Sequence, residues 1–131
     1  MPSVLVVDDD ADTRHMLRAV LEDAGYVVCV APDGQPALER LQTSHERLVA
    51  PLDLRMPGIN GQQVIEAVAA QHTLATRHAY ILMTANPATL PLSFVTQLRS
   101  LRMPVLAKPF DLDTLLRVVV DASSRVHASM S

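Results

Sequence analysis

The sequence of 131 residues contains no tryptophan, two phenylalanines, two tyrosines and one cysteine. With so few aromatic side chains, the core has to consist of aliphatic residues and methionine. The single cysteine, Cys29, excludes an internal disulfide, and its place in an apolar run predicts an inert, buried thiol. The first apolar run, Val4 to Val7, is far shorter than a membrane span, and no signal peptide is visible. We therefore expect a soluble, cytoplasmic domain.

The chain also lacks an excess of positive charge, a repeat, a linker and a low-complexity segment. Its formal net charge is −3, and its arginines are scattered along the sequence. A nucleic-acid-binding surface is normally basic, so we predict no direct binding to nucleic acid, and none to membranes. The length is that of one ordinary domain.

Short apolar runs alternate with helical patterns throughout the chain. The expected strands are residues 4–7, 26–31, 48–52, 79–84 and 105–107, and apolar residues at helical spacing fall within 16–24, 37–41, 64–69, 94–101 and 112–119. Asp10 or Asp12 can cap the first helix, and Asp111 the last. Five buried strands alternating with five helices predict one doubly wound α/β domain with a parallel sheet. We place this domain at residues 1–124, followed by a tail of residues 125–131. The segment from Ser123 to Ser131 is small and polar, so we expect it to fray.

The stretch from Leu48 to Gln63 joins a buried strand to a tight loop. The strand ends on Asp53, and the loop contains Pro57, Gly58, Asn60 and Gly61, which set or permit its backbone angles. In open parallel sheets the ligand crevice lies at the carboxyl ends of the strands. From this stretch alone, Asp53 is either a structural cap for the loop or a chemical group.

Other polar residues follow the remaining strands at the same predicted edge. Asp8 and Asp9 follow the first strand, Thr84 ends the fourth, and Lys108 follows the fifth. Three carboxylates in one crevice repel one another, so either some are protonated or a cation is bound. Oxygen ligands suit Mg²⁺ or Mn²⁺ better than Zn²⁺. A cation beside a nucleophilic carboxylate, a hydroxyl and an amine is what phosphoryl transfer requires.

Lys108 is the only lysine in the chain, against ten arginines. A compact ammonium on a flexible stem differs chemically from a planar guanidinium, so this position favours a specific role, although chance placement is the alternative.

Four motifs together resemble the receiver domain of bacterial two-component response regulators. They are Val6-Val7-Asp8-Asp9, Leu52-Asp53-Leu54-Arg55-Met56-Pro57-Gly58, Met83-Thr84-Ala85 and Lys108-Pro109-Phe110, in the order and near the spacing of that family. The resemblance runs from about Ser3 to Ala122. It implies a flavodoxin-like sheet of strand order 2-1-3-4-5, and a phosphorylation switch that is not a turnover enzyme.

The resemblance also implies a role for each matching residue. Asp53 would accept a phosphoryl group from the phosphohistidine of a histidine kinase or histidine phosphotransfer domain. Asp8, Asp9, Asp53 and the backbone carbonyl of Arg55 would hold Mg²⁺, or Mn²⁺ in its place. Thr84 and Lys108 would bind the phosphoryl oxygens. Further expected partners are a downstream protein, a covalently linked output domain, or a second copy bound through the fourth helix (94–101), the fifth strand and the last helix.

Three features depart from the family pattern. Pro51 lies within the central strand, where it has no amide to donate, so we predict a bulge or a missing sheet bond at Ala50-Pro51. Val105 stands where the family usually has an aromatic residue that reports phosphorylation. The segment from Thr84 to Lys108 is about two residues longer than is common and contains two prolines.

Two other functions stay open. One, suggested by Pro51 and Val105, is a degenerate receiver that binds a partner without being phosphorylated. The other is an aspartate-nucleophile phosphatase, suggested by the acids after the first strand, which would leave Asp53 unexplained. Asp10 and Asp12 are expected to be capping or solvated acids. The histidines show no ligand spacing and are expected at the surface: His15, His45, His72, His78 and His127.

Overall fold

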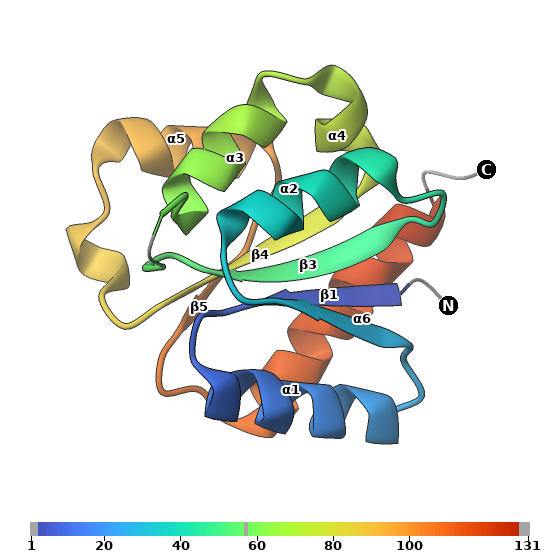
Figure 1. Ribbon diagram of the computed structural model, residues 1–131. Coiled ribbons are helices and arrows are strands. Elements are labelled where there is room, and N and C mark those ends of the chain that lie inside the picture. Colours follow the sequence, from blue (N-terminus) through green and yellow to red (C-terminus); the bar gives the residue numbers. More distant parts are fainter. Residues whose placement is uncertain (1–2, 57, 129–131) are drawn as a thin grey trace.

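A computed structural model describes residues 3–56 and 58–128 of the chain. Five parallel strands form one sheet in the order β2-β1-β3-β4-β5, with helices on both faces (Figure 1). The strands are β1 (Ser3–Val7), β2 (Val28–Ala31), β3 (Leu48–Asp53), β4 (Ala79–Thr84) and β5 (Val105–Ala107). The predicted doubly wound parallel sheet and its strand order are confirmed.

The described residues form six α-helices where five were expected. They are α1 (Ala11–Asp23), α2 (Gly34–Thr43), α3 (Gly61–Ala69), α4 (His72–Arg77), α5 (Leu92–Ser100) and α6 (Leu112–Ala128), with a 3₁₀ turn η1 (Pro87–Thr89) before α5. The additional helix, α4, is short, and Leu74 is its one buried residue. None of the described helices is long and apolar enough to cross a membrane.

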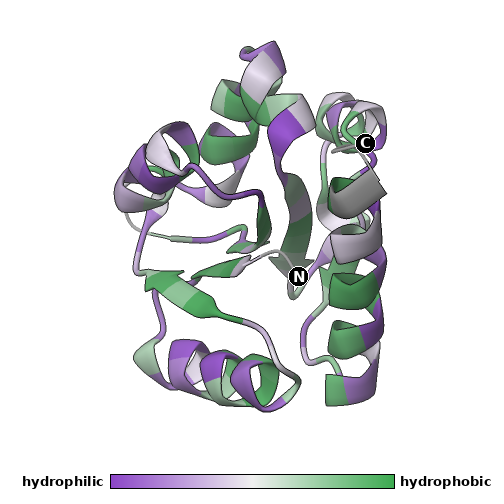
Figure 2. Ribbon diagram, turned by 90° about the vertical axis from the view of Figure 1, so that its right-hand side faces the viewer, coloured by the Kyte–Doolittle hydropathy of each residue, from purple (hydrophilic) through white to green (hydrophobic). Residues whose placement is uncertain are grey.

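The apolar residues of the strands form two hydrophobic cores, one on each face of the sheet. In β1, Leu5 and Val7 pack under α2 and α3, while Val4 and Val6 pack under α1 and α6. Figure 2 shows the hydrophobic strands between helices whose outer sides are hydrophilic. Because both faces of the sheet are covered, the sequences of the strands are continuous apolar runs and do not alternate between apolar and polar residues.

Individual residues mark where helices begin and end. Asp10 caps α1 by accepting hydrogen bonds from the Thr13 amide at 3.3 Å and the Thr13 hydroxyl at 2.6 Å. Asp111 accepts from the Thr114 amide at 2.7 Å at the start of α6. Gly25 follows α1 with a φ of 100°, a left-handed conformation that glycine adopts without steric cost.

Pro51 interrupts the pairing of β3 with β1. Pairing joins Val4 to Val49 and Val7 to Leu52, but not the residues between them, whereas pairing with β4 is continuous. The residue offset between β1 and β3 is the same on both sides of the gap, so no residue is inserted. The missing sheet bond is thus confirmed, and it is a gap and not a bulge.

Two observations bear on expectations about the surface. The last helix, α6, continues past Ser123 to Ala128, and Ser123 and Val126 are buried; fraying of residues 125–131 stays a prediction. Residues 129–131 lie outside the described part, and the boundary at 124 stays a prediction. His78 is buried and not at the surface, with an exposed fraction of 4%.

His78 connects three elements. Its Nδ1 accepts from the Leu48 amide at 3.0 Å, and its Nε2 lies 2.9 Å from the Leu41 carbonyl oxygen. One ring nitrogen must accept and the other donate, so the side chain is a neutral imidazole with its proton on Nε2. It therefore joins the start of β4 to the start of β3 and to α2.

Candidate functional site

The polar residues that were expected to converge come from four strand ends on one edge of the sheet. Asp8 and Asp9 follow β1, Asp53 ends β3, Thr84 ends β4 and Lys108 follows β5. Asp8, Asp53 and Thr84 are buried, with exposed fractions of 1%, 9% and 5%. The backbone aligns these ends, because the Lys108 amide donates to the Thr84 carbonyl at 2.8 Å.

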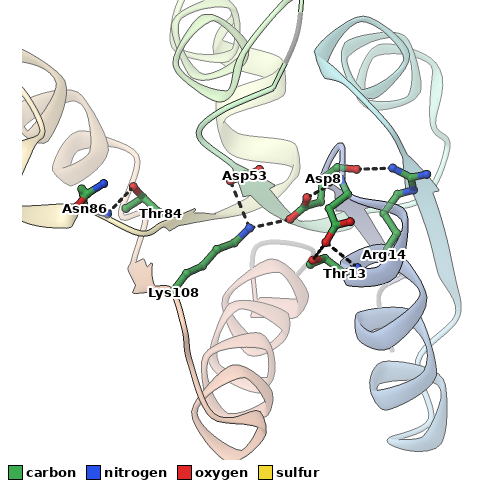
Figure 3. Close-up of polar contacts among 8 residues, drawn as sticks. Asp8, Thr13, Arg14, Asp53, Thr84, Asn86 and Lys108 are labelled. Atoms are coloured by element: carbon green, nitrogen blue, oxygen red, sulfur yellow. Dashed lines mark hydrogen bonds and ion pairs between the residues drawn. The ribbon is translucent and has the colours of Figure 1, made fainter.

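Three carboxylates and the ammonium of the only lysine in the sequence lie close together. Carboxylate oxygens of Asp8, Asp9 and Asp53 lie within 4.8 Å of one another. The Nζ of Lys108 is 2.9 Å from Asp8 Oδ2 and 3.4 Å from Asp53 Oδ1. Figure 3 shows the lysine extending from beyond β5 so that its ammonium reaches both acids. The structure therefore brings these four residues into one cluster.

The cluster carries more negative than positive charge. Three carboxylates and one ammonium sum to a formal charge of −2. Burial raises the pKa of Asp53, as does the charge of Asp8, while Lys108 opposes that rise. Burial lowers the pKa of Lys108, but the hydrogen bond to Asp8 and the charge of Asp53 outweigh it, so the pKa is raised overall. Both results indicate that a second cation would be stabilised here.

The donor set fits a hard divalent cation. Asp8, Asp9 and Asp53 supply carboxylate oxygens, and Asp9 is exposed, so that water can complete the coordination. Mg²⁺ prefers oxygen ligands, retains several waters and is usually held by one or two carboxylates. The cluster contains no histidine or cysteine, the ligands typical of zinc sites.

Two contacts that the sequence did not suggest fix Asp8. Its Oδ1 accepts from the Asp10 amide at 3.0 Å, and its backbone carbonyl accepts from Arg14 Nη1 at 2.8 Å. The only signal for Arg14 was its place in the first turns of a helix that begins directly behind the acids. Arg14 therefore holds the end of β1 from the side of α1 (Figure 3).

Two glycines allow the chain to fold closely around Asp53. A Cβ atom on Gly61 would lie 2.4 Å from the Asp53 carbonyl oxygen, and one on Gly34 would lie 2.3 Å from the Ile59 carbonyl oxygen. The amides of these glycines bind the same loop: Gly61 donates to Leu54 and Gly34 to Ile59, at 3.0 and 3.1 Å. Sequence reasoning placed Gly61 in a tight loop but did not reveal the close approach at either glycine.

Two expected site residues are less closely tied to the cluster. The Thr84 hydroxyl accepts from the Asn86 amide at 3.2 Å and lies apart from the acids in Figure 3. The ligand role of the Arg55 carbonyl stays a prediction, and Pro57, expected to shape the loop, lies outside the described residues. Val105 is on β5 with an exposed fraction of 39%, so no aromatic ring stands at that position.

Comparison with known proteins gives the same family as the site. A family model for the response regulator receiver domain matches residues 4–120. The chain belongs to this family. The transcriptional regulatory protein CpxR of Escherichia coli is 36% identical to this receiver over 90 residues, which cover 69% of the chain and 36% of CpxR. The receiver spans about a quarter to a half of the first curated relatives that it matches.

Solved structures agree with the fold of this receiver. The chemotaxis response regulator CheY4 of Vibrio cholerae is 31% identical, with a TM-score of 0.76 over 93% of this chain and 98% of that one. The response regulator TrrA of Thermotoga maritima, solved in complex with Mg²⁺ and BeF, is 28% identical, with a TM-score of 0.74 over 93% and 99% of the two chains. Receiver domains of two-component systems are phosphoryl-accepting switches, which places this chain in signal transduction.

Proposed function

We propose that Asp53 of this receiver accepts a phosphoryl group from a phosphohistidine in a Mg²⁺-dependent reaction. The observation that carries the proposal is the contact of Lys108 with both Asp8 and Asp53 within a cluster of three carboxylates. A merely structural cap on the β3 loop would not require the acids of β1 or the only lysine of the chain to converge on it.

The reaction exchanges one bond to phosphorus for another. A carboxylate oxygen of Asp53 forms an O–P bond while the N–P bond of the donor breaks. The bonding electron pair stays on the imidazole nitrogen of the donor, which then takes up a proton. Bound Mg²⁺, held by Asp8, Asp9, Asp53 and the Arg55 carbonyl, would neutralise charge on the phosphoryl oxygens.

Lys108 and Thr84 would bind the transferred phosphoryl group. The ammonium of Lys108 already lies 3.4 Å from Asp53 Oδ1, so it can contact a phosphoryl oxygen once the acid is modified. The Thr84 hydroxyl, at the end of the adjacent strand, would donate to another oxygen while it still accepts from Asn86. Both contacts stabilise the transferred group electrostatically, which is the main protein contribution to phosphoryl transfer.

Labelling with a small phosphoryl donor tests the proposal. Purified protein is incubated with phosphoramidate and Mg²⁺, and intact mass spectrometry counts the phosphoryl groups. We expect one group on the wild type and none on Asp53→Asn. Asp23→Asn, which changes an exposed acid on α1, is the matched control and should label like the wild type. Equal labelling of Asp53→Asn and the wild type would refute the assignment.

Two observations favour a second function, that of a degenerate receiver. The sheet gap at Pro51 lies two residues before Asp53, and Val105 cannot supply the aromatic coupling of the family. Such a protein would bind its partner without phosphorylation. Calorimetric titration with Mg²⁺ separates the two functions, because a receiver that binds no Mg²⁺ at millimolar concentration belongs to this second class.

The partners follow from this function and remain part of the proposal. The phosphoryl donor would be a histidine kinase or a histidine phosphotransfer domain. The output would be a downstream protein, a linked output domain or a second copy of the chain, bound through α5, β5 and α6. Exposed apolar side chains occur on each of these elements: Leu92, Val105 and Leu112. A cytoplasmic location is also part of the proposal, because a histidine kinase or histidine phosphotransfer domain has to reach Asp53.

A further inference from the structure

The side chain of Arg14 contacts the backbone between the two acids that follow β1. Arg14 is the fourth residue of α1, and its Nη1 donates to the Asp8 carbonyl oxygen at 2.8 Å. Figure 3 shows the Asp8 carboxylate directed to Lys108 and the Asp8 carbonyl directed to Arg14. This carbonyl belongs to the peptide unit that joins Asp8 to Asp9. Arg14 therefore acts on the backbone that links two of the three carboxylates of the cluster.

The two acids are held in different ways. The Asp8 carboxylate accepts from the Asp10 amide at 3.0 Å and from Lys108 Nζ at 2.9 Å. In the part of the chain that the structure describes, neither the amide nor the carboxylate of Asp9 makes a hydrogen bond or an ion pair. The orientation of the exposed Asp9 thus depends on the plane of the Asp8–Asp9 peptide, which Arg14 fixes.

The location of the Arg14 charge argues against a role in stabilising α1 itself. The N-terminus of a helix carries a partial positive charge, so a cation near its first turn is disfavoured. Asp10 already caps this helix. Among the described residues the Arg14 side chain forms no ion pair, and its one hydrogen bond is the contact with the Asp8 carbonyl. A hydrogen bond from a charged donor is stronger than a neutral one, so this contact can fix the peptide.

We propose that Arg14 is a positioning residue that raises the Mg²⁺ affinity of the cluster by fixing the Asp8–Asp9 peptide, so that Asp9 faces the ion. This inference rests on the proposed function, which assigns Mg²⁺ to these acids. Removing a group that orients a metal ligand typically weakens metal binding by about 10–100-fold. The guanidinium charge alone would act in the opposite direction, because it repels a divalent cation. A positioning role and a purely electrostatic role therefore predict opposite changes in affinity when Arg14 is neutralised.

Calorimetric titration of the unphosphorylated, metal-free protein with MgCl₂ tests the sign of this change. Arg14→Met keeps an unbranched side chain without charge or donor, and it should bind Mg²⁺ about tenfold more weakly than the wild type. Arg14→Lys keeps a charged donor, so it should bind within about threefold of the wild type. The control Arg18→Met removes the same charge from an exposed site one turn further along α1, and it should change the affinity less than about twofold.

Two further measurements separate positioning from a general loss of structure. In metal-free ¹⁵N spectra the amide signal of Asp9 should shift in Arg14→Met and stay in place in Arg18→Met, while both variants unfold cooperatively on heating. In labelling with phosphoramidate, the Mg²⁺ concentration that gives half the maximal rate should rise about tenfold in Arg14→Met. The rate at saturating Mg²⁺ should change less than about threefold, because the bound ion itself restores the orientation of Asp9.

Tighter or unchanged Mg²⁺ binding by Arg14→Met, equal weakening by Arg18→Met, or no recovery in Arg14→Lys would overturn the inference. Failure of the proposed function gives a different result. A wild type that binds Mg²⁺ but takes up no phosphoryl group would refute phosphoryl transfer to Asp53 and leave the role of Arg14 intact. A wild type that binds no Mg²⁺ at millimolar concentration would refute both.

Discussion

Replacing His78 tests how much its two buried hydrogen bonds stabilise this fold. Replacing it by leucine removes the acceptor for the Leu48 amide and the donor to the Leu41 carbonyl, at 3.0 and 2.9 Å. Both backbone groups would then be buried without partners. Each unsatisfied group costs about 1–3 kcal/mol, so His78→Leu should lower the free energy of unfolding by about 2–6 kcal/mol. This is a large share of the about 5–15 kcal/mol typical of a domain.

Urea denaturation at pH 7.5 measures that loss, and two further variants define its cause. His78→Gln brings its amide group only to the position of Nε2, so it can donate to Leu41 but has no acceptor at the position of Nδ1 for the Leu48 amide, and it should lose about half as much. His15→Leu changes an exposed histidine on α1 and should shift the free energy of unfolding by less than about 0.5 kcal/mol.

The same residue predicts a pH dependence. Burial lowers the pKa of His78 below its usual value, and the charges of Arg77 and Arg47 act in the same direction. The unfolded chain therefore takes up a proton at a higher pH than the folded one. The stabilisation is complete above the unfolded pKa of about 6.5 and is lost as pH falls through it toward the lower folded pKa.

The loss of stability between pH 7.5 and pH 5.5 should reach at most about 1.4 kcal/mol for this residue. The change in the free energy of unfolding between the two pH values is measured for the wild type and for His78→Leu. The difference between the two changes isolates the contribution of His78, because the acids contribute equally to both proteins. Identical pH dependence in the two proteins would show that the pKa of His78 is not lowered in the folded state. A loss below about 0.5 kcal/mol for His78→Leu at pH 7.5 would show that the two hydrogen bonds contribute little.

Three predictions concern the acidic cluster. Lys108→Met should bind Mg²⁺ about tenfold more tightly in calorimetry, because the ammonium no longer occupies Asp8 and Asp53; weaker binding would contradict a competing role. Gly61→Ala should lose about 1–3 kcal/mol in urea denaturation and label more slowly, because its Cβ would press on the Asp53 backbone; unchanged stability would show that the loop adapts freely. Because the pKa of Asp53 is raised without metal, Mg²⁺ should move its titration, followed by ¹³C NMR, to lower pH; no movement would place the ion elsewhere.

Much of this protein could be predicted from local patterns in its sequence. Continuous apolar runs such as Val4 to Val7 indicate strands covered on both faces, and Asp10, Asp111 and Gly25 mark helix ends by chemistry that acts within a few residues. The convergence of Asp8, Asp53 and Lys108 could also be predicted, because parallel strands bring their carboxyl ends to one edge.

The tertiary structure decided what depends on contacts between distant segments. His78 looked like a surface residue because no local pattern reveals that α2 and β3 bury it. The contacts of Gly34 and Gly61 with backbone carbonyls are likewise invisible along the chain. The sequence thus determined the elements and the acidic edge, whereas packing alone determined which polar groups are buried and which backbone segments lie in contact, because burial and contact depend on three-dimensional distance.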